Sequence, residues 1–102
     1  MSAFATRILP QVKLTLRESS DTFDEEIKSY IDGCKNDLLN AGMLDKYFPE
    51  DNNGEVDESV LQAIRYYCLS NYGLYNADSE KYAKSYLSLK STLLVQSKYI
   101  EE

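Results

Sequence analysis

Apolar side chains recur at three- and four-residue steps over residues 22–41, which predicts an amphipathic helix. Thr22 and Glu25 have the spacing of a capping box, and Gly42 stands where a glycine commonly closes a helix. Gly33 lies inside this segment, where glycine costs about 1 kcal/mol relative to alanine. Gly33 either permits the close approach of another helix or is a tolerated cost, and we favour the second interpretation. The apolar stripe consists of Phe23, Ile27, Tyr30, Ile31, Cys34, Leu38 and Ala41.

Two further helices are predicted in the second half of the chain. The first covers residues 58–72, with Asp57 as its N-cap and Gly73 just beyond its end. The second covers residues 78–96 and begins at the N-cap Asp78. Three amphipathic helices predict an all-α fold, a small three-helix bundle. The two stripes consist of Val60, Ile64, Tyr67 and Cys68, and of Tyr82, Ala83, Tyr86, Leu89, Leu93 and Leu94.

Residues 43–57 interrupt the helical pattern and predict an acidic loop, with a short helical turn near its start. Its acids resemble a calcium-binding loop, which needs glycine at its sixth position. Counting from Asp51, that position is Val56, so no metal site is predicted. Beyond the last helix, residues 97–102 are expected to form a flexible tail.

The N-terminal residues 1–20 show a different period. Val12, Leu14 and Leu16 alternate with three polar side chains, Lys13, Thr15 and Arg17, which is typical of a strand. The rest of the sequence has no second strand-like segment. We therefore expect an extended arm that is solvated, packed on the bundle, or paired with a neighbouring chain.

The size and composition indicate one folded domain. The chain has 102 residues, of which 43% are hydrophobic and 27% charged, and residues 1–102 are expected to form a single helical domain. No apolar run is long enough to cross a bilayer, and the N-terminus has no secretory signal. The expectation is a soluble intracellular protein that does not contact a membrane.

The residue types available argue against catalysis. The sequence contains no histidine, which is the commonest general base near neutral pH and a frequent metal ligand. The two thiols, Cys34 and Cys68, do not complete a zinc site on their own and are expected to be buried and reduced. We therefore predict a protein that is not an enzyme and uses no cofactor.

The charge of the chain is unevenly distributed. The net charge of −6 divides into +3 over residues 1–17, −10 over residues 18–58 and +1 over residues 59–102. Such an acidic protein repels a phosphate backbone, which disfavours duplex binding through a basic patch. The acidic segment is either a solvated face that maintains solubility or one of two unlike surfaces that meet head to tail in a ring.

The chain carries more apolar surface than a three-helix monomer of this size easily covers. Six of its nine tyrosines fall between residues 66 and 86, and several apolar side chains project away from the predicted stripes. Tyrosine is enriched at protein interfaces. We expect the surplus to be buried against neighbouring subunits. The candidate interface residues are Val12, Leu14, Leu16, Tyr66, Leu69, Tyr75 and Leu87.

Several stretches of the chain resemble a known family. They are AIRYYCLSNYG at residues 63–73, NADSEKY at residues 76–82 and SYLSLK at residues 85–90, with DEEI, KNDL and AG in the first predicted helix. Together these stretches resemble the phage head–tail connector family, the small all-helical head-completion adaptors of long-tailed phages and prophages. The resemblance covers residues 12–97 and contains no catalytic motif. Gly33 departs from the small helix-forming residue expected there.

The resemblance implies a structural role in the virion. Such adaptors form a ring of about twelve copies beneath the portal of the capsid, a closed assembly built from unlike surfaces. They extend the DNA channel, let DNA pass without sequence-specific binding, and offer a platform for stopper or tail-completion proteins. The location implied is the head–tail junction, reached from the host cytoplasm during assembly.

A second hypothesis comes from a different class of protein. The carboxylates of residues 18–58 would also suit an acidic helical binding module that sequesters a basic partner, in the manner of a DNA-mimic regulator. That module would be a monomer or dimer whose binding collapses with salt, whereas the connector would form high-order oligomers.

Overall fold

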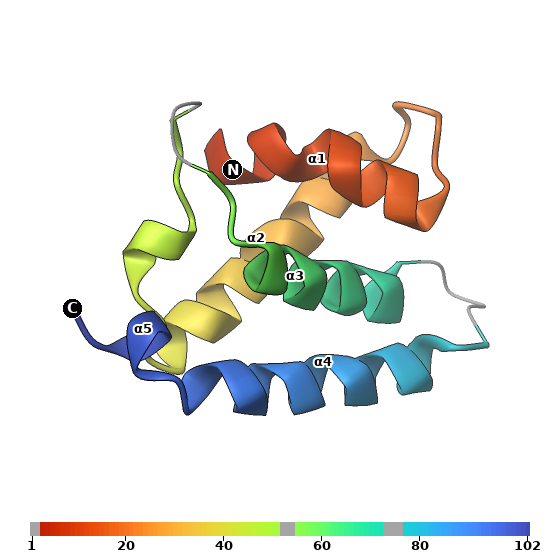
Figure 1. Ribbon diagram of the computed structural model, residues 1–102. Coiled ribbons are helices and arrows are strands. Elements are labelled where there is room, and N and C mark those ends of the chain that lie inside the picture. Colours follow the sequence, from red (N-terminus) through yellow and green to blue (C-terminus); the bar gives the residue numbers. More distant parts are fainter. Residues whose placement is uncertain (1–2, 52–54, 73–76) are drawn as a thin grey trace.

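Helices make up most of the computed structural model, which describes residues 3–51, 55–72 and 77–102 and shows no strand among them (Figure 1). The predicted all-α fold is confirmed, and its three predicted helices correspond to α2, α3 and α4. The described chain also forms α1 and α5, which the sequence pattern did not predict. The elements are α1 (Ala3–Leu16), α2 (Asp24–Asn40), the 3-10 turn η1 (Asp45–Tyr47), α3 (Glu58–Asn71), α4 (Ser79–Leu94) and α5 (Ser97–Ile100).

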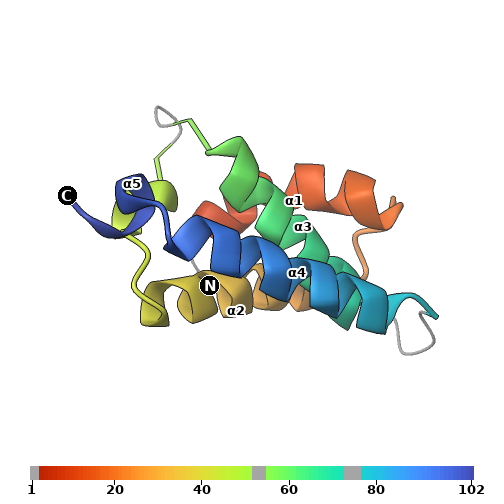
Figure 2. The same ribbon diagram turned by 60° about the horizontal axis from the view of Figure 1, so that its bottom comes forward.

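Helix α3 lies at the centre of the arrangement. It contacts α1, α2 and α4. Figure 1 shows α1 and α4 on opposite sides of α3, with α2 crossing behind, and Figure 2 shows α4 in front of α3 with α1 beyond it. The outer surfaces of α1 and α4 therefore face away from each other.

The core is built from the inward stripes of these helices. Every helix contributes at least one buried side chain, and η1 is flanked by two more. Burial of this apolar surface supplies most of the free energy of folding. The buried side chains are Phe4, Ala5, Ile8, Leu9, Val12, Ile27, Ile31, Cys34, Leu38, Met43, Phe48, Val60, Leu61, Ala63, Ile64, Cys68, Tyr86, Leu93 and Tyr99.

The prediction of an extended arm over residues 1–20 is wrong, because Ala3–Leu16 form helix α1. Phe4, Ile8 and Val12 follow one another at four-residue steps, and all three are fully buried. Pro10 lies inside the helix, where it removes one backbone hydrogen bond and costs about 3 kcal/mol. Burial of the α1 stripe offsets this cost, since fully burying a large apolar side chain gains about 1.5–3 kcal/mol.

The helix ends match the predictions in part. Asp57 caps α3 as predicted, accepting hydrogen bonds from the amides of Ser59 and Val60. Gly42 closes α2 with a φ of +112°, which favours glycine. The predicted capping box is wrong, because α2 begins at Asp24 and the Thr22 hydroxyl accepts a hydrogen bond from Ser20.

The C-terminal segment is anchored to the fold rather than forming a flexible tail over residues 97–102. Tyr99 of α5 is 1% exposed, and its hydroxyl donates to both carboxylate oxygens of Asp57 at 3.1 Å. The Tyr99 carbonyl accepts from the amide of Leu44 at 2.8 Å. One carboxylate thus caps α3 and holds α5.

The predicted acidic loop, residues 43–57, contains η1 and buries Phe48.

Gly33 permits the close approach of a neighbouring helix, contrary to the interpretation that we favoured. A Cβ atom at this position would lie 3.0 Å from the hydroxyl oxygen of Tyr67 on α3. The Tyr67 ring in turn meets the edge of Tyr86 on α4, with centroids 5.2 Å apart. Gly33 therefore makes room for an aromatic contact that links α2, α3 and α4.

We predict that the effect of Gly33→Ala depends on the Tyr67 hydroxyl. In a Tyr67→Phe background the alanine is expected to raise the free energy of unfolding by up to about 1 kcal/mol, because the helix gains propensity without a clash. With Tyr67 intact, the gain should shrink or reverse sign. Urea unfolding of the four proteins in this double-mutant cycle measures the coupling, and identical alanine effects in both backgrounds would contradict the contact.

We predict that Tyr99 stabilises the fold through both its ring and its hydroxyl. Tyr99→Phe removes the hydrogen bonds to Asp57 and should cost about 1 kcal/mol. Tyr99→Ala also empties the buried site and should cost about 3–5 kcal/mol. Thermal and urea unfolding measure both values. Substitution of exposed Glu101 by alanine is the control and should change stability by less than about 0.5 kcal/mol; an equally small effect of Tyr99→Ala would show that α5 is not anchored.

Candidate functional site

Two exposed apolar surfaces occur on opposite sides of the molecule. Leu14 on α1 is 81% exposed, and on α4 Leu87 and Val95 are 57% and 80% exposed. Large apolar side chains in such positions are typical of protein interaction surfaces when they gather with other apolar groups. Each surface is therefore a candidate site of association.

The surface on α1 is hollowed into a groove of about 670 Å³, which we call the α1 groove. Its apolar wall comes from Leu9, Pro10 and Leu14. Its charged and polar rim consists of Lys13, Arg17, Glu18, Ser19, Asp21 and Asp24. The groove thus joins an apolar strip to a rim on which three carboxylates outnumber two cations.

The backbone turn at the end of α1 forms one end of this groove. Arg17 has a φ of 57°, in the left-handed region that costs a residue with a Cβ about 1–2 kcal/mol. The amide of Glu18 donates to the carbonyl of Lys13 at 3.0 Å, which closes the helix as a Schellman turn does. The chain reverses here, so the segment after α1 runs back beside the last helical turn of α1.

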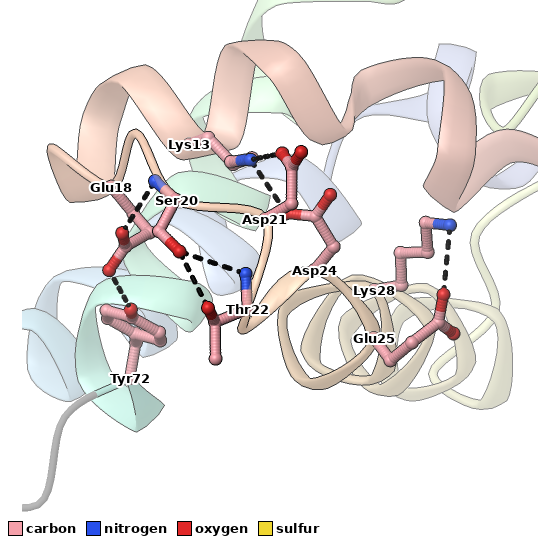
Figure 3. Close-up of polar contacts among 9 residues, drawn as sticks. All are labelled: Lys13, Glu18, Ser20, Asp21, Thr22, Asp24, Glu25, Lys28 and Tyr72. Carbon is pink, nitrogen blue, oxygen red and sulfur yellow. Dashed lines mark hydrogen bonds and ion pairs between the residues drawn. The ribbon is translucent and has the colours of Figure 1, made fainter.

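Lys13 of α1 forms ion pairs with two acidic residues of the groove rim (Figure 3). Its ammonium group lies 2.7 Å from a carboxylate oxygen of Asp24 and 3.0 Å from one of Asp21. The hydrogen bonds with Asp24 and then Asp21 raise the pKa of Lys13, so the charge is retained at neutral pH. The two ion pairs hold the start of α2 against α1.

Glu18 ties the same segment to the end of α3 (Figure 3). Its carboxylate accepts from the Tyr72 hydroxyl at 2.6 Å and from the Ser20 amide at 2.9 Å. The Tyr72 hydrogen bond is the main reason that the pKa of Glu18 is lowered. Burial, and then the Glu18 carboxylate, raise the pKa of Tyr72 to about 12. The rim is therefore held in place from two helices.

The surface on α4 is an uninterrupted exposed face, which we call the α4 face. At 100° per residue its members span one side of the helix, opposite the buried Tyr86 and Leu93. Glu80 and Lys84 form an exposed ion pair at 3.6 Å. The α4 face consists of Glu80, Lys81, Lys84, Leu87, Ser88, Ser91, Thr92 and Val95.

The candidate interface residues from the sequence fall into four groups. Leu14 and Leu87 are exposed, one on each surface. Val12 is fully buried in the core, because α1 is a helix and not a strand. Tyr75 lies outside the described residues. The remaining three residues are half-buried: Leu16, Tyr66 and Leu69. Leu16 and Tyr66 pack on the core.

Tyr66 is committed to an internal contact. Its ring stacks on Tyr82 of α4, with centroids 6.5 Å apart and an interplanar angle of 24°.

The groove residues Pro10 and Arg17 were not selected as candidates from the sequence. Phe4, Ile8 and Val12 are spaced four residues apart, which is the pattern of a buried helical stripe and would have predicted α1. On such a helix Pro10 and Leu14 lie on the outer side.

Many carboxylates of the acidic segment 18–58 are matched with cations. Lys28 pairs with Glu25 at 3.3 Å, Lys35 pairs with Glu50 at 3.5 Å, and Arg65 pairs with Glu58 at 3.1 Å. Asp37 accepts from Tyr86 and from Lys90. Burial raises the pKa of Asp37, but these hydrogen bonds outweigh it and leave the pKa lowered. Carboxylates paired in this way do not present the uniform charge array of a DNA mimic.

The described part of the chain offers little for metal chemistry or thiol reactivity. No group of three or more potential metal ligands gathers among these residues. Cys34 and Cys68 are free and buried, and burial raises the pKa of both thiols, that of Cys68 to about 12. Thiols in this state are poor nucleophiles. None of the described helices has the length and apolarity to span a membrane.

We predict that the Glu18–Tyr72 hydrogen bond loses its contribution to stability in acid. A carboxyl whose pKa is lowered by folding stabilises the fold above its unfolded pKa, about 4.3, and the stabilisation is lost as the pH falls through the folded value. The difference in urea midpoint between wild type and Glu18→Gln should therefore narrow from pH 7 to pH 3. In a Tyr72→Phe background, the difference in urea midpoint caused by Glu18→Gln should change less between pH 7 and pH 3. An equal change in both backgrounds would contradict the role of Tyr72.

Comparison with known proteins identifies the family. The family model described as phage connector protein matches residues 8–100, which is nearly the whole chain and includes most of α1 and all of α2, α3, α4 and α5. Searches of curated proteins and of solved structures find no match to this chain. The all-helical fold of the described residues agrees with this family. The chain belongs to the phage connector protein family and is a structural connector of the phage virion.

Proposed function

We propose that this connector assembles as a ring beneath the portal of the capsid, at the junction between head and tail. A closed ring of identical subunits needs two different complementary surfaces on each copy, since contact between identical patches ends at a dimer. The observation that carries the proposal is the placement of two unlike surfaces on opposite sides of α3 (Figures 1 and 2), the α1 groove and the α4 face, each with an exposed leucine.

In this proposal the ring extends the DNA channel below the portal and offers its lower rim to a stopper or tail-completion protein. The chain is acidic, with a net charge of −6, and a channel that must release DNA benefits from a surface that does not grip phosphate. DNA passes without sequence-specific binding. The number of copies proposed, about twelve, comes from the family resemblance and the closed symmetry that it implies.

The proposal makes a direct prediction for the portal. Purified protein mixed with the purified portal of the same phage should form rings coaxial with the portal, visible by electron microscopy. In the phage, deletion of the gene should leave DNA-filled heads that lose their DNA or fail to join tails. A plasmid copy should restore infectious particles. Fully infectious particles that lack the protein, together with no binding to the portal, would refute the proposal.

A further inference from the structure

The two surfaces differ in form, since one is a groove and the other is the outer side of a helix, and each carries an exposed leucine. The α1 groove presents an apolar wall of Leu9, Pro10 and Leu14. On the α4 face, Leu87 projects with 57% of its surface exposed, and the small side chains of Ser88 and Ser91 lie beside it. A single apolar side chain that stands above small neighbours fits a groove better than it fits another convex helix.

The charges around these surfaces are also complementary. Lys81 and Lys84 lie on the α4 face, within two turns of Leu87. The rim of the groove carries three carboxylates against the two cations Lys13 and Arg17, whereas the α4 face carries two lysines against Glu80 alone. The Asp21 side chain is 92% exposed although its carboxylate already contacts Lys13. Opposite charges at the edge of an apolar contact favour the correct partner and fix its orientation.

Pairing of like surfaces is less favourable. Two α4 faces would offer their lysines only the carboxylate of Glu80, which already pairs with Lys84 at 3.6 Å. Two α1 grooves would bring together two rims that each carry three carboxylates and only two cations. Contact between unlike surfaces avoids both arrangements and leaves each copy with one free groove and one free α4 face.

We propose that the α4 face of one copy docks into the α1 groove of the next, with Leu87 against Leu14 and Pro10 and with Lys81 and Lys84 toward Glu18 and Asp21. The inference rests on the proposed ring and assigns its subunit contact. Because the two surfaces lie on opposite sides of α3, every docked copy presents the free surface needed for the following one.

The test uses two variants that each destroy one surface. Leu14→Arg places a cation in the groove, where it repels the lysines of the α4 face. Leu87→Asp removes the projecting leucine and places an anion near the acidic rim. Each variant alone should weaken self-association by about tenfold or more, measured by sedimentation velocity over a range of concentrations. An equimolar mixture should form heterodimers and no larger species, because the first variant keeps an intact α4 face and the second an intact groove.

The control is Asn36, an exposed residue on α2 outside both surfaces. Asn36→Arg and Asn36→Asp carry the same new charges and should associate like wild type, and circular dichroism should show that all four variants are folded. Two outcomes would overturn the inference: a wild type that is monomeric at every concentration, or variants whose association is unchanged or that form no heterodimer on mixing.

The portal experiment separates this inference from the proposed function. If Leu14→Arg and Leu87→Asp copies each still form rings on the portal, the assignment of the two surfaces is wrong while the ring itself stands. If wild-type protein forms no ring on the portal, the proposed function fails.

Discussion

The burial of α3 on several sides determines the architecture of this connector. An apolar helix surrounded by α1, α2 and α4 removes Val60, Ile64 and Cys68 from water, and the neighbours must lie on different sides to do so. The arrangement separates α1 from α4 and directs their outer surfaces away from each other. The requirement for a shared core thus gives a monomer two distant faces, which is the property that a ring subunit needs.

Polar contacts position the elements that the core alone leaves loose. Asp57 caps α3 and also accepts the Tyr99 hydroxyl, so the start of α3 and the C-terminal helix are fixed by one carboxylate. Lys13 and Glu18 act in the same way at the other end of α3, where they tie the segment after α1 to α2 and to Tyr72. The α1 groove is therefore a consequence of these contacts and not of a loose loop.

The sequence predicts α2, α3 and α4 well because each carries a long stripe with helical period. It does not predict α1, because Val12, Leu14 and Leu16 alternate over a window too short to separate the two periods. The contact between Gly33 and Tyr67 and the anchoring of Tyr99 are also missed. These contacts join residues far apart in the chain, and no local pattern encodes them.

The candidate site is predicted in part for the same reason. Leu87 lies off the apolar stripe of its helix and is exposed, as the helical period predicts. Leu14 was selected because it fits the alternation of a strand, but it is exposed on a helix. Val12 follows the same alternation and is buried. The groove depends on a left-handed turn at Arg17, which a residue other than glycine rarely adopts.

The central claim, that copies meet through unlike faces, is tested most directly by cross-linking within the assembled ring. Rings built from equal amounts of normal and ¹⁵N-labelled protein are treated with a carbodiimide, which joins a lysine amine directly to a carboxylate, and are analysed by mass spectrometry. The account predicts links of mixed isotope between Lys81 or Lys84 of one copy and Glu18 or Asp21 of another. Mixed-isotope links that join only α4 to α4, or that avoid both surfaces, would contradict it.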